Sequence, residues 1–227
     1  MDSTGRATST DPPEALSLAT LIGTGNQREC WQHPLDPSLC IKVSRAGQSA
    51  DLLENALELH YLQHLNTRKL TSQHLPKIHQ PVATSKGHGI VVELIRGRDG
   101  QAAQTLERML HSGAISQLEA LGLITEMLHW LHKNGVIWND VNLCNVVVAH
   151  TCAGRPYLVI VDGLGGRRYD FRYRLRCKFK FLERWTARRK INQHFPKILA
   201  YLGLSDAPPA GSKAASAALP RGATVHH

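Results

Sequence analysis

Long apolar runs are absent from this chain of 227 residues. None of its runs approaches the ~18–20 residues that a membrane-spanning helix requires. The first residues, MDSTGRATSTDPPEA, also lack the charged-then-apolar layout of a secretory signal. Both absences argue against a transmembrane or exported protein, and we expect a cytoplasmic one.

Cysteine is scarce and shows no pairing pattern. The five cysteines are odd in number and contain no CxxC, so neither a disulfide framework nor a zinc site is indicated. We expect reduced, mostly packed thiols. The histidine pairs His60/His64 and His129/His132 lack an HExxH arrangement and lie in apolar-patterned segments, which also argues against zinc.

Acidic residues are outnumbered, 18 Asp and Glu against 27 Lys and Arg, giving a net charge of +9. Most of the excess lies in segment 167–190, where eleven Lys and Arg face only Asp170 and Glu183. Aromatic residues alternate with the basic ones in RRYDFRYRLRCKFKFLERW, as they often do in nucleic-acid-binding surfaces. Acidic lipid is another candidate ligand, and the third alternative is a solvated helix face whose aromatic residues dock on the large lobe.

Composition and periodicity divide the chain into two unequal lobes between tails. Residues 1–16 and 204–227 lack helical or strand periodicity, and we expect disordered tails. Residues 17–95 predict a small antiparallel sheet with one helix, at about 49–66, and strands at 78–84 and 89–95. Residues 96–203 predict a mostly helical lobe: a helix over 115–134, two short strands at 146–150 and 157–162, and a basic helix or helix pair. The fold class is therefore α+β.

Four residues of the first lobe could serve a phosphate site, although each also has an ordinary explanation. Gly23 and Gly25 in LIGTGNQREC would let backbone amides approach a phosphate, or they mark any tight turn. Lys42 ends an apolar strand, where lysines commonly extend to solvent. Glu58 lies in a helix among apolar residues, and an inward lysine could pair with it.

The second lobe carries two carboxylates and an amide at the ends of its short strands. Asp140 and Asn145 stand five residues apart before one strand, and Asp162 ends the next. Phosphoryl transfer needs a carboxylate to orient and deprotonate the accepting hydroxyl, and oxygen ligands for Mg²⁺. Taken singly, each residue is explained as a turn former.

The order of these features resembles the protein-kinase plan. LIGTGNQRECWQHPLDPSLCIKV is similar to a glycine-rich loop leading to a strand lysine, NDVNLCNVVV to a catalytic loop, and LVIVDGLGG to the metal-binding DFG region. More closely, the chain resembles the bacterial YrbL family, called PhoP regulatory network proteins, which are kinase-like. The resemblance implies a two-lobed protein-kinase-like fold that binds ATP and Mg²⁺.

The same resemblance assigns roles residue by residue. In the first lobe, Gly23 and Gly25 would lie over the nucleotide phosphates, Lys42 would contact them, and Glu58, or less well Glu54, would pair with Lys42. The backbone of Glu93 to Ile95 would meet the adenine edge. In the second lobe, Asp140 would be the catalytic base, while Asn145 and Asp162 would hold Mg²⁺.

Five positions depart from the kinase pattern. Arg28 replaces the third glycine of the loop, and either turns into the site or caps the hairpin outside. Trp138 and Asn139 replace the histidine and arginine before the base, Asn142 replaces a phosphate-contacting lysine, and Gly163 replaces the phenylalanine of DFG. Only about forty residues expected to be ordered follow Asp162, which is short for a peptide-substrate platform. Three hypotheses therefore stand: a phosphotransferase with a small or partner-supplied acceptor, a catalytically weak regulatory module that binds protein partners, and a polyanion-binding protein.

Overall fold

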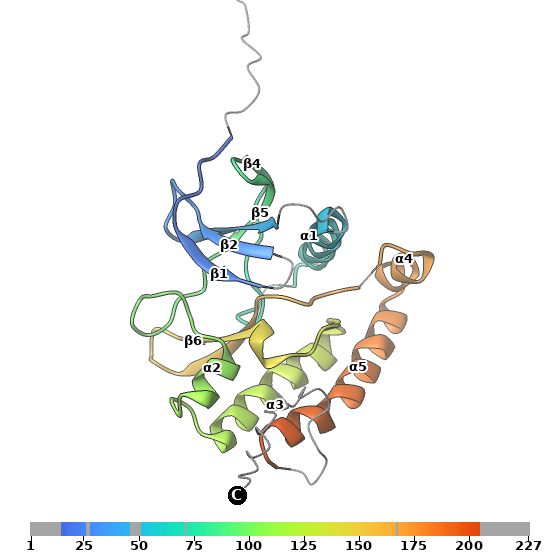
Figure 1. Ribbon diagram of the computed structural model, residues 1–227. Helices are drawn as coiled ribbons and strands as arrows, with labels where there is room; N and C mark the ends of the chain where they lie inside the picture. The colour runs from blue at the N-terminus through green and yellow to red at the C-terminus, as the bar shows by residue number, and fades with distance from the viewer. Residues whose placement is uncertain (1–14, 26–27, 46–50, 71, 167, 205–227) are drawn as a thin grey trace, which may run out of the picture.

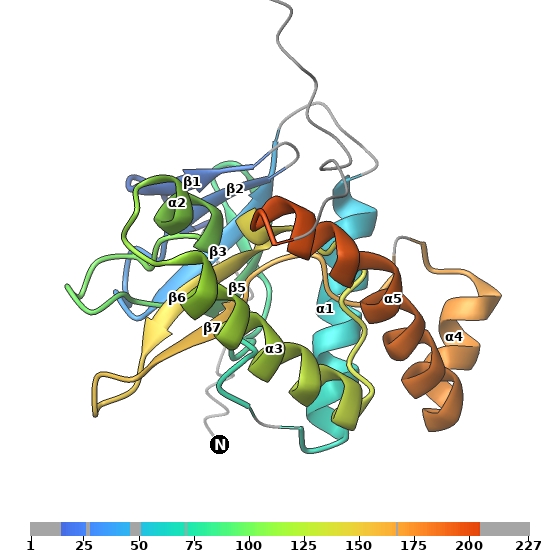
Figure 2. The same cartoon turned by 90° about the horizontal axis from the view of Figure 1, so that it is seen from below.

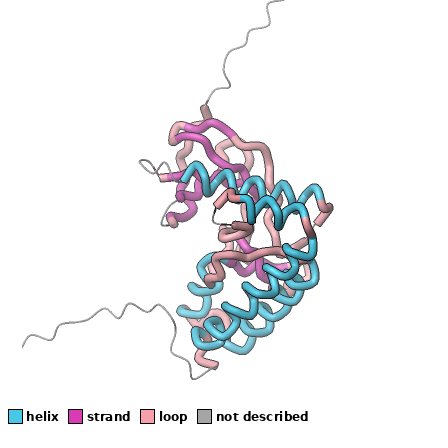
Figure 3. Tube along the Cα trace, turned by 90° about the vertical axis from the view of Figure 1, so that its right-hand side faces the viewer, coloured by secondary structure: helices cyan, strands magenta, loops and turns pink. Residues whose placement is uncertain are grey.

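The computed structural model describes residues 15–25, 28–45, 51–70, 72–166 and 168–204, with the backbone alone for 51–55. The fold is α+β and two-lobed, as predicted (Figure 1). Figure 3 shows the strands of the larger sheet at one end and most helices at the other. The elements are β1 (Leu21–Thr24), β2 (Arg28–Gln32), β3 (Leu39–Ser44), α1 (Asp51–Thr67), β4 (Val82–Thr84), β5 (Gly87–Glu93), α2 (Leu106–His111), α3 (Gln117–Asn134), the 3-10 turn η1 (Leu143–Asn145), β6 (Val146–His150), β7 (Pro156–Ile160), α4 (Phe171–Lys178) and α5 (Lys180–Tyr201).

The five-stranded sheet of the first lobe is antiparallel, with the order β1-β2-β3-β5-β4. Side chains alternate between the two faces of its central strand β3. Ile41 and Val43 belong to a buried cluster on one face, and Cys40 belongs to a second cluster that Leu59 of α1 contacts. Lys42 follows Cys40 by two residues, so its side chain lies on the same face of the sheet. The strand period therefore directs Lys42 toward α1.

Helix α1 packs between the sheet and the helical lobe. Leu59 contacts the sheet, whereas Leu57, Tyr61, Leu62 and Leu65 join the main core of the helical lobe. This main core is formed by α1, α3, β6, β7, α5 and the loops between them. The leucine spacing predicted part of the core in α1 and α3, but it was wrong for Leu118, which is 76% exposed. Helix α1 therefore contacts both the sheet and the main core, and Glu58 stands between Leu57 and Leu59, which make these two contacts.

The long helix α3 is fixed at both ends by local signals. A capping box joins Ser116 and Glu119, with the Glu119 amide donating to Ser116 Oγ at 3.2 Å and the Ser116 amide donating to Glu119 Oε2 at 3.0 Å. Gly135 ends the helix in the left-handed region at φ +68°, and an added Cβ would lie 2.7 Å from Arg184 Cγ of α5. The predicted glycine stop is confirmed.

Several predicted boundaries were wrong. The strand expected over 78–84 begins at Val82, with Ile78 forming only an isolated bridge, and α2 was not predicted. The basic segment forms two helices, α4 and α5, which confirms the helix pair among the two forms predicted. Of the two predicted tails, residues 1–14 and 205–227 lie outside the described residues, while Leu16 pairs with Ala83 and Ser85 through backbone hydrogen bonds of 2.9 Å each. The division at residue 95 stays a prediction.

Two predictions about the whole chain can be compared with the structure. No helix in the described ranges is both long enough and apolar enough to span a bilayer. The cysteines are free thiols, and three of the five are buried or half-buried, as expected, whereas Cys144 in η1 and Cys152 are exposed.

Candidate functional site

A buried ion pair joins the sheet to α1. Lys42 Nζ lies 2.7 Å from Glu58 Oε1, and the two residues are only 8% and 5% exposed. Lys42 Nζ also donates to the carbonyl of Val161, next to Asp162 in the other lobe. Both predicted residues therefore meet, and the lysine links the two lobes. The side chain of Glu54, the weaker candidate, lies outside the described residues.

Arg28 turns into the site rather than outward, which decides an alternative that the sequence left open. Its Nη1 donates to Glu58 Oε2 and its Nη2 to Asp162 Oδ1. The Arg28 side chain is 10% exposed. Burial would lower the pKa of Arg28, but the charges of Glu58 and Asp162 raise it overall. Two cations and two carboxylates therefore alternate across the interlobe contact.

Asp162 is held in its ionised form by its neighbours. Burial alone would raise the pKa of this carboxyl, but the charges of Lys42 and Arg28 and the hydrogen bonds from Arg28 and the Gly163 amide together lower it. The Gly163 amide donates to Asp162 Oδ1 at 2.6 Å. The Asp162 side chain is 43% exposed, so an ion could reach it from solvent.

Asp140 and Asn145 lie together at the loop before β6. Asn145 Nδ2 donates to Asp140 Oδ2 at 2.9 Å and to the Asp140 carbonyl at 3.0 Å. The Asn145 carbonyl accepts the Val161 amide at 2.9 Å, which brings Asn145 beside the strand end that carries Asp162. Asp140 itself is exposed. The three polar residues predicted in this lobe therefore share one place, with Asp140 open to solvent.

Gly163 explains why this site has no phenylalanine after Asp162. Its φ is +83°, and an added Cβ would lie 2.8 Å from the Asp140 carbonyl oxygen and 2.9 Å from Asp140 Cβ. Its carbonyl accepts the amides of Asn139 at 2.8 Å and Asp140 at 3.1 Å. Gly163 thus connects the Asp140 loop directly to the Asp162 loop, and only a glycine fits.

The other departures from the kinase pattern have structural roles. Trp138 is 2% exposed, belongs to the main core, and pairs with Leu164 in an isolated bridge. Asn142 caps η1, since its Oδ1 accepts the Cys144 amide at 3.3 Å. The side chain of Asn142 therefore shapes the loop rather than contacting a phosphate as a lysine would.

A second buried network supports the Asp140 loop. Tyr61 Oη donates to Glu183 Oε1 at 3.0 Å and accepts the Ile137 amide at 2.8 Å. Burial and the nearby Glu183 raise the pKa of Tyr61. Arg68 bonds Glu183 Oε2 at 2.6 Å and the Asn134 carbonyl at 2.7 Å. The chain between α3 and the Asp140 loop is thereby tied to α1 and α5.

The glycine loop and the segment 93–95 flank this constellation. Gly23 lies in β1 opposite Cys30, an added Cβ there would meet nothing within 4 Å, and the Gly25 amide donates to the Arg28 carbonyl at 2.8 Å. The loop tip, residues 26–27, lies outside the described residues. The Glu93 amide and the Ile95 carbonyl already have backbone partners in Lys77 and Ala103, each at 2.9 Å. An adenine base would have to use other backbone groups of this segment, so that role stays a prediction.

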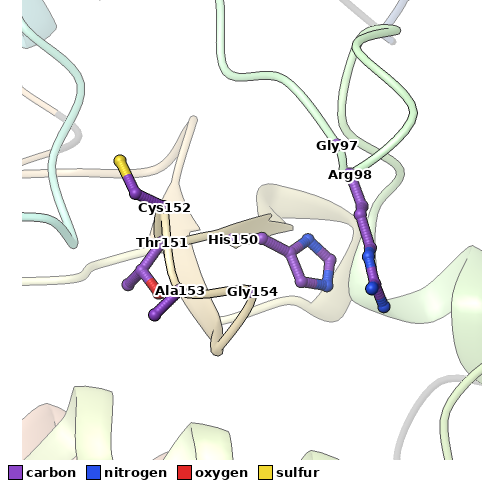
Figure 4. A pocket seen from close by; sticks show the side chains of 7 residues that line it. All are labelled: Gly97, Arg98, His150, Thr151, Cys152, Ala153 and Gly154. Carbon is purple, nitrogen blue, oxygen red and sulfur yellow. The ribbon is translucent and has the colours of Figure 1, made fainter.

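A surface pocket lies elsewhere, between the loop after β5 and the β6–β7 hairpin (Figure 4). It is lined by Gly97, Arg98 and residues 150–154. The ring of His150 extends toward Arg98, while Cys152 points to the opposite side of the hairpin. None of the predicted site residues lines this pocket, so it is separate from the Lys42–Asp162 constellation.

Sequence reasoning missed the contacts that hold the site together. Tyr61 and Glu183 carried no visible signal, because a tyrosine and a glutamate in helical segments read as core and solvent positions. Arg28 was singled out, but its direction was undecided. In the sequence, Gly163 stands out only as a departure from the kinase pattern, and its position directly after Asp162 is the signal that could have identified it.

The chain belongs to the family described as PhoP regulatory network protein YrbL, whose sequence pattern matches residues 15–203. Two relatives bear the name "Uncharacterized protein YrbL", one from Escherichia coli (strain K12) and one from Shigella flexneri. Each is 30% identical over 155 residues, which cover 66% of this chain and 72% of the relative. The predicted family is confirmed, and the matched range contains every residue of the candidate site.

Proposed function

We propose that this YrbL-family protein binds ATP with Mg²⁺ between its lobes and transfers the terminal phosphoryl group to a hydroxyl of an acceptor, with ADP as the leaving group and Asp140 as the base. The Lys42–Glu58 pair carries the proposal. A buried lysine at 2.7 Å from a helix glutamate, beside Asp162, is the arrangement that kinases use to position nucleotide phosphates. A purely stabilising role explains this pair poorly, because the cost of removing two charges from water commonly offsets the attraction between them.

The donor set fits a magnesium ion. Mg²⁺ prefers oxygen ligands and one or two carboxylates. Asp162 is ionised and partly exposed, and it already pairs with a cation, because it accepts a hydrogen bond from the guanidinium of Arg28. Because Asn145 uses its Nδ2 to bond Asp140, its Oδ1 is the atom it would offer a cation. Bound Mg²⁺ would neutralise charge on the nucleotide phosphates.

The remaining steps belong to the residues of the chain. Lys42 would hold phosphate oxygens while Glu58 fixes its direction. Asp140 would accept the proton of the attacking hydroxyl, and the bond from Asn145 holds its carboxylate in place. Its exposure leaves room for an acceptor, consistent with a small or partner-supplied substrate.

One observation favours a second candidate, a regulatory module with weak or no turnover. Arg28 bonds both Glu58 and Asp162, so the guanidinium competes with a metal ion for Asp162. Such a protein would bind nucleotide and signal through partners. The family description, PhoP regulatory network protein, suits a regulatory role.

Thermal shift with ATP and Mg²⁺, combined with ATP turnover and autophosphorylation assays, tests both candidates. Wild type would be compared with Asp140→Ala, Asp162→Ala and the matched control Asp99→Ala, which removes an exposed carboxylate outside the constellation. Turnover lost in Asp140→Ala while nucleotide stabilisation persists supports transfer. Stabilisation that is lost in Asp162→Ala, without wild-type turnover, supports the regulatory module. Absence of any stabilisation of wild type by ATP and Mg²⁺ defeats both.

A further inference from the structure

Helices α4 and α5 present a surface of nearly uniform positive charge. Within residues 168–190, the exposed basic side chains are Arg168, Arg172, Arg174, Lys178, Lys180, Arg184, Arg188 and Arg189. The exposed acid there is Asp170, which caps α4. Glu183 is 1% exposed and is paired internally with Arg68. The surface therefore attracts anions, and the buried carboxylate of Glu183 does not weaken that attraction.

Large aromatic rings lie exposed among these charges. Phe171, Phe181 and Trp185 are 74%, 67% and 59% exposed. The alternative in which the aromatic residues of this segment dock on the large lobe holds for Tyr173, which is 1% exposed, and is wrong for these three. Exposed apolar rings in water carry a free-energy cost that a partner can relieve, so they mark an interaction surface.

The rings gather where the two helices meet. Phe179 ends α4 and begins α5, and its ring centroid lies 6.0 Å from that of Phe181. Trp185 follows Phe181 by one helical turn, on the same face. Figure 2 shows α5 alongside α3 and α4 outside it, at the edge of the molecule. We call Lys178, Phe179, Lys180, Phe181, Trp185 and Arg188 the α4–α5 corner.

We propose that the α4–α5 corner binds the surface of a bilayer that contains anionic phospholipids, with its aromatic rings in the headgroup layer. Basic residues beside Phe and Trp on a helix surface are the composition of helices that lie in a membrane interface. The cations attract the lipid phosphates, and the rings gain by leaving water. The proposal uses none of the nucleotide-site residues, so it stands or falls separately.

The geometry favours a lipid surface over a single-stranded nucleic acid. Nucleic-acid binding of that kind uses a basic groove that follows the strand, with rings stacked inside it. Here the exposed rings of Phe179, Phe181 and Trp185 belong to the junction of two helices and the first turns of α5, and Figure 2 shows α4 at the edge of the molecule. Residues 205–227 of the same chain are not a suitable anionic ligand for the corner, because they contain one acidic residue, Asp206, and two basic ones, Lys213 and Arg221.

Flotation of the full chain with vesicles tests the proposal. We expect binding to phosphatidylcholine mixed with phosphatidylglycerol, little binding to phosphatidylcholine alone, and release at high salt. Trp185 supplies a direct readout: Trp138 is buried and the other two tryptophans are half-buried, so Trp185 is the exposed one of four. Its fluorescence should shift to the blue on binding and be quenched by brominated lipid, and Trp185→Phe should abolish both signals.

Two variants separate charge from insertion. Lys178→Gln, Lys180→Gln and Arg188→Gln combined should weaken partitioning about a hundredfold, since each basic residue contributes about fivefold. Phe179→Ala with Phe181→Ala should weaken it about tenfold and reduce the blue shift, because less apolar area enters the interface. The matched control removes three exposed basic residues elsewhere: Lys69→Gln, Lys77→Gln and Arg108→Gln.

Each contrary result overturns the proposal. If the control variant loses as much vesicle binding as the corner variant, the binding depends on the net charge of the protein and not on the corner. Equal binding to neutral vesicles would remove the charge argument. Binding to single-stranded DNA or RNA, without flotation at the same salt, would assign the corner to nucleic acid. Circular dichroism of every variant checks that the fold is retained.

Discussion

Replacement of Arg28 by alanine should destabilise the protein and also strengthen its response to Mg²⁺. The guanidinium is 10% exposed and bonds two carboxylates, Glu58 and Asp162. Removing one partner of a buried ion pair costs about 3–5 kcal/mol when the other charge is left uncompensated. Here Glu58 keeps Lys42 at 2.7 Å, and Asp162 keeps the Gly163 amide at 2.6 Å and is 43% exposed.

The expected loss is therefore smaller, about 1–3 kcal/mol, which lowers the Tm of a chain of this size by roughly 3–10 °C. The released Asp162 carboxylate should then bind a cation more readily. A hydrogen bond to a charged group contributes about 1.5–3 kcal/mol, so its removal should tighten Mg²⁺ binding about tenfold or more.

Differential scanning calorimetry over a range of Mg²⁺ concentrations, with and without ATP, measures both effects. The matched control is Arg155→Ala. Its ion pair with Glu126, at 2.8 Å, joins side chains that are 69% and 42% exposed, and we expect a loss below about 1 kcal/mol. An Arg28→Ala variant with the same Tm as wild type would refute the stabilising role of the buried ion-pair network. A variant that loses all stabilisation by Mg²⁺ would instead make Arg28 part of the ligand site.

Three further predictions concern the supporting structure. Gly163→Ala should cost about 2–4 kcal/mol by denaturant unfolding, because the new Cβ meets the Asp140 carbonyl at 2.8 Å and φ is +83°; a stable variant would contradict the link between the two loops. Glu183→Ala should cost about 3–5 kcal/mol, since it leaves Arg68 without its carboxylate, and unchanged urea unfolding would show that the network is unimportant. The pKa of Asp162 is lowered, so its stabilising contribution is complete above about pH 4 and is lost as pH falls through the lowered pKa; Asp162→Asn should flatten that acid limb of the stability profile, and an unchanged limb would count against it.

Local patterns in the sequence predicted most elements of this fold, although they missed α2 and placed the start of β4 four residues too early. The leucine spacing predicted α1 and α3, the serine–glutamate box and Gly135 fix the ends of α3, and the two-residue period of β3 directs Lys42 inward. These features follow from backbone geometry and nearest neighbours. The order of Lys42, Glu58, Asp140 and Asp162 along the chain then indicated that they meet.

Tertiary structure alone decided how they meet. The direction of Arg28 depends on carboxylates 30 and 134 residues away, and no local period encodes such a pairing. The need for glycine at position 163 arises from the Asp140 loop packed against it. Likewise, segment 167–190 revealed its charge in the sequence, but the exposure of Phe181 and Trp185 follows only from how α5 packs on α3, because burial depends on the neighbours that the fold provides.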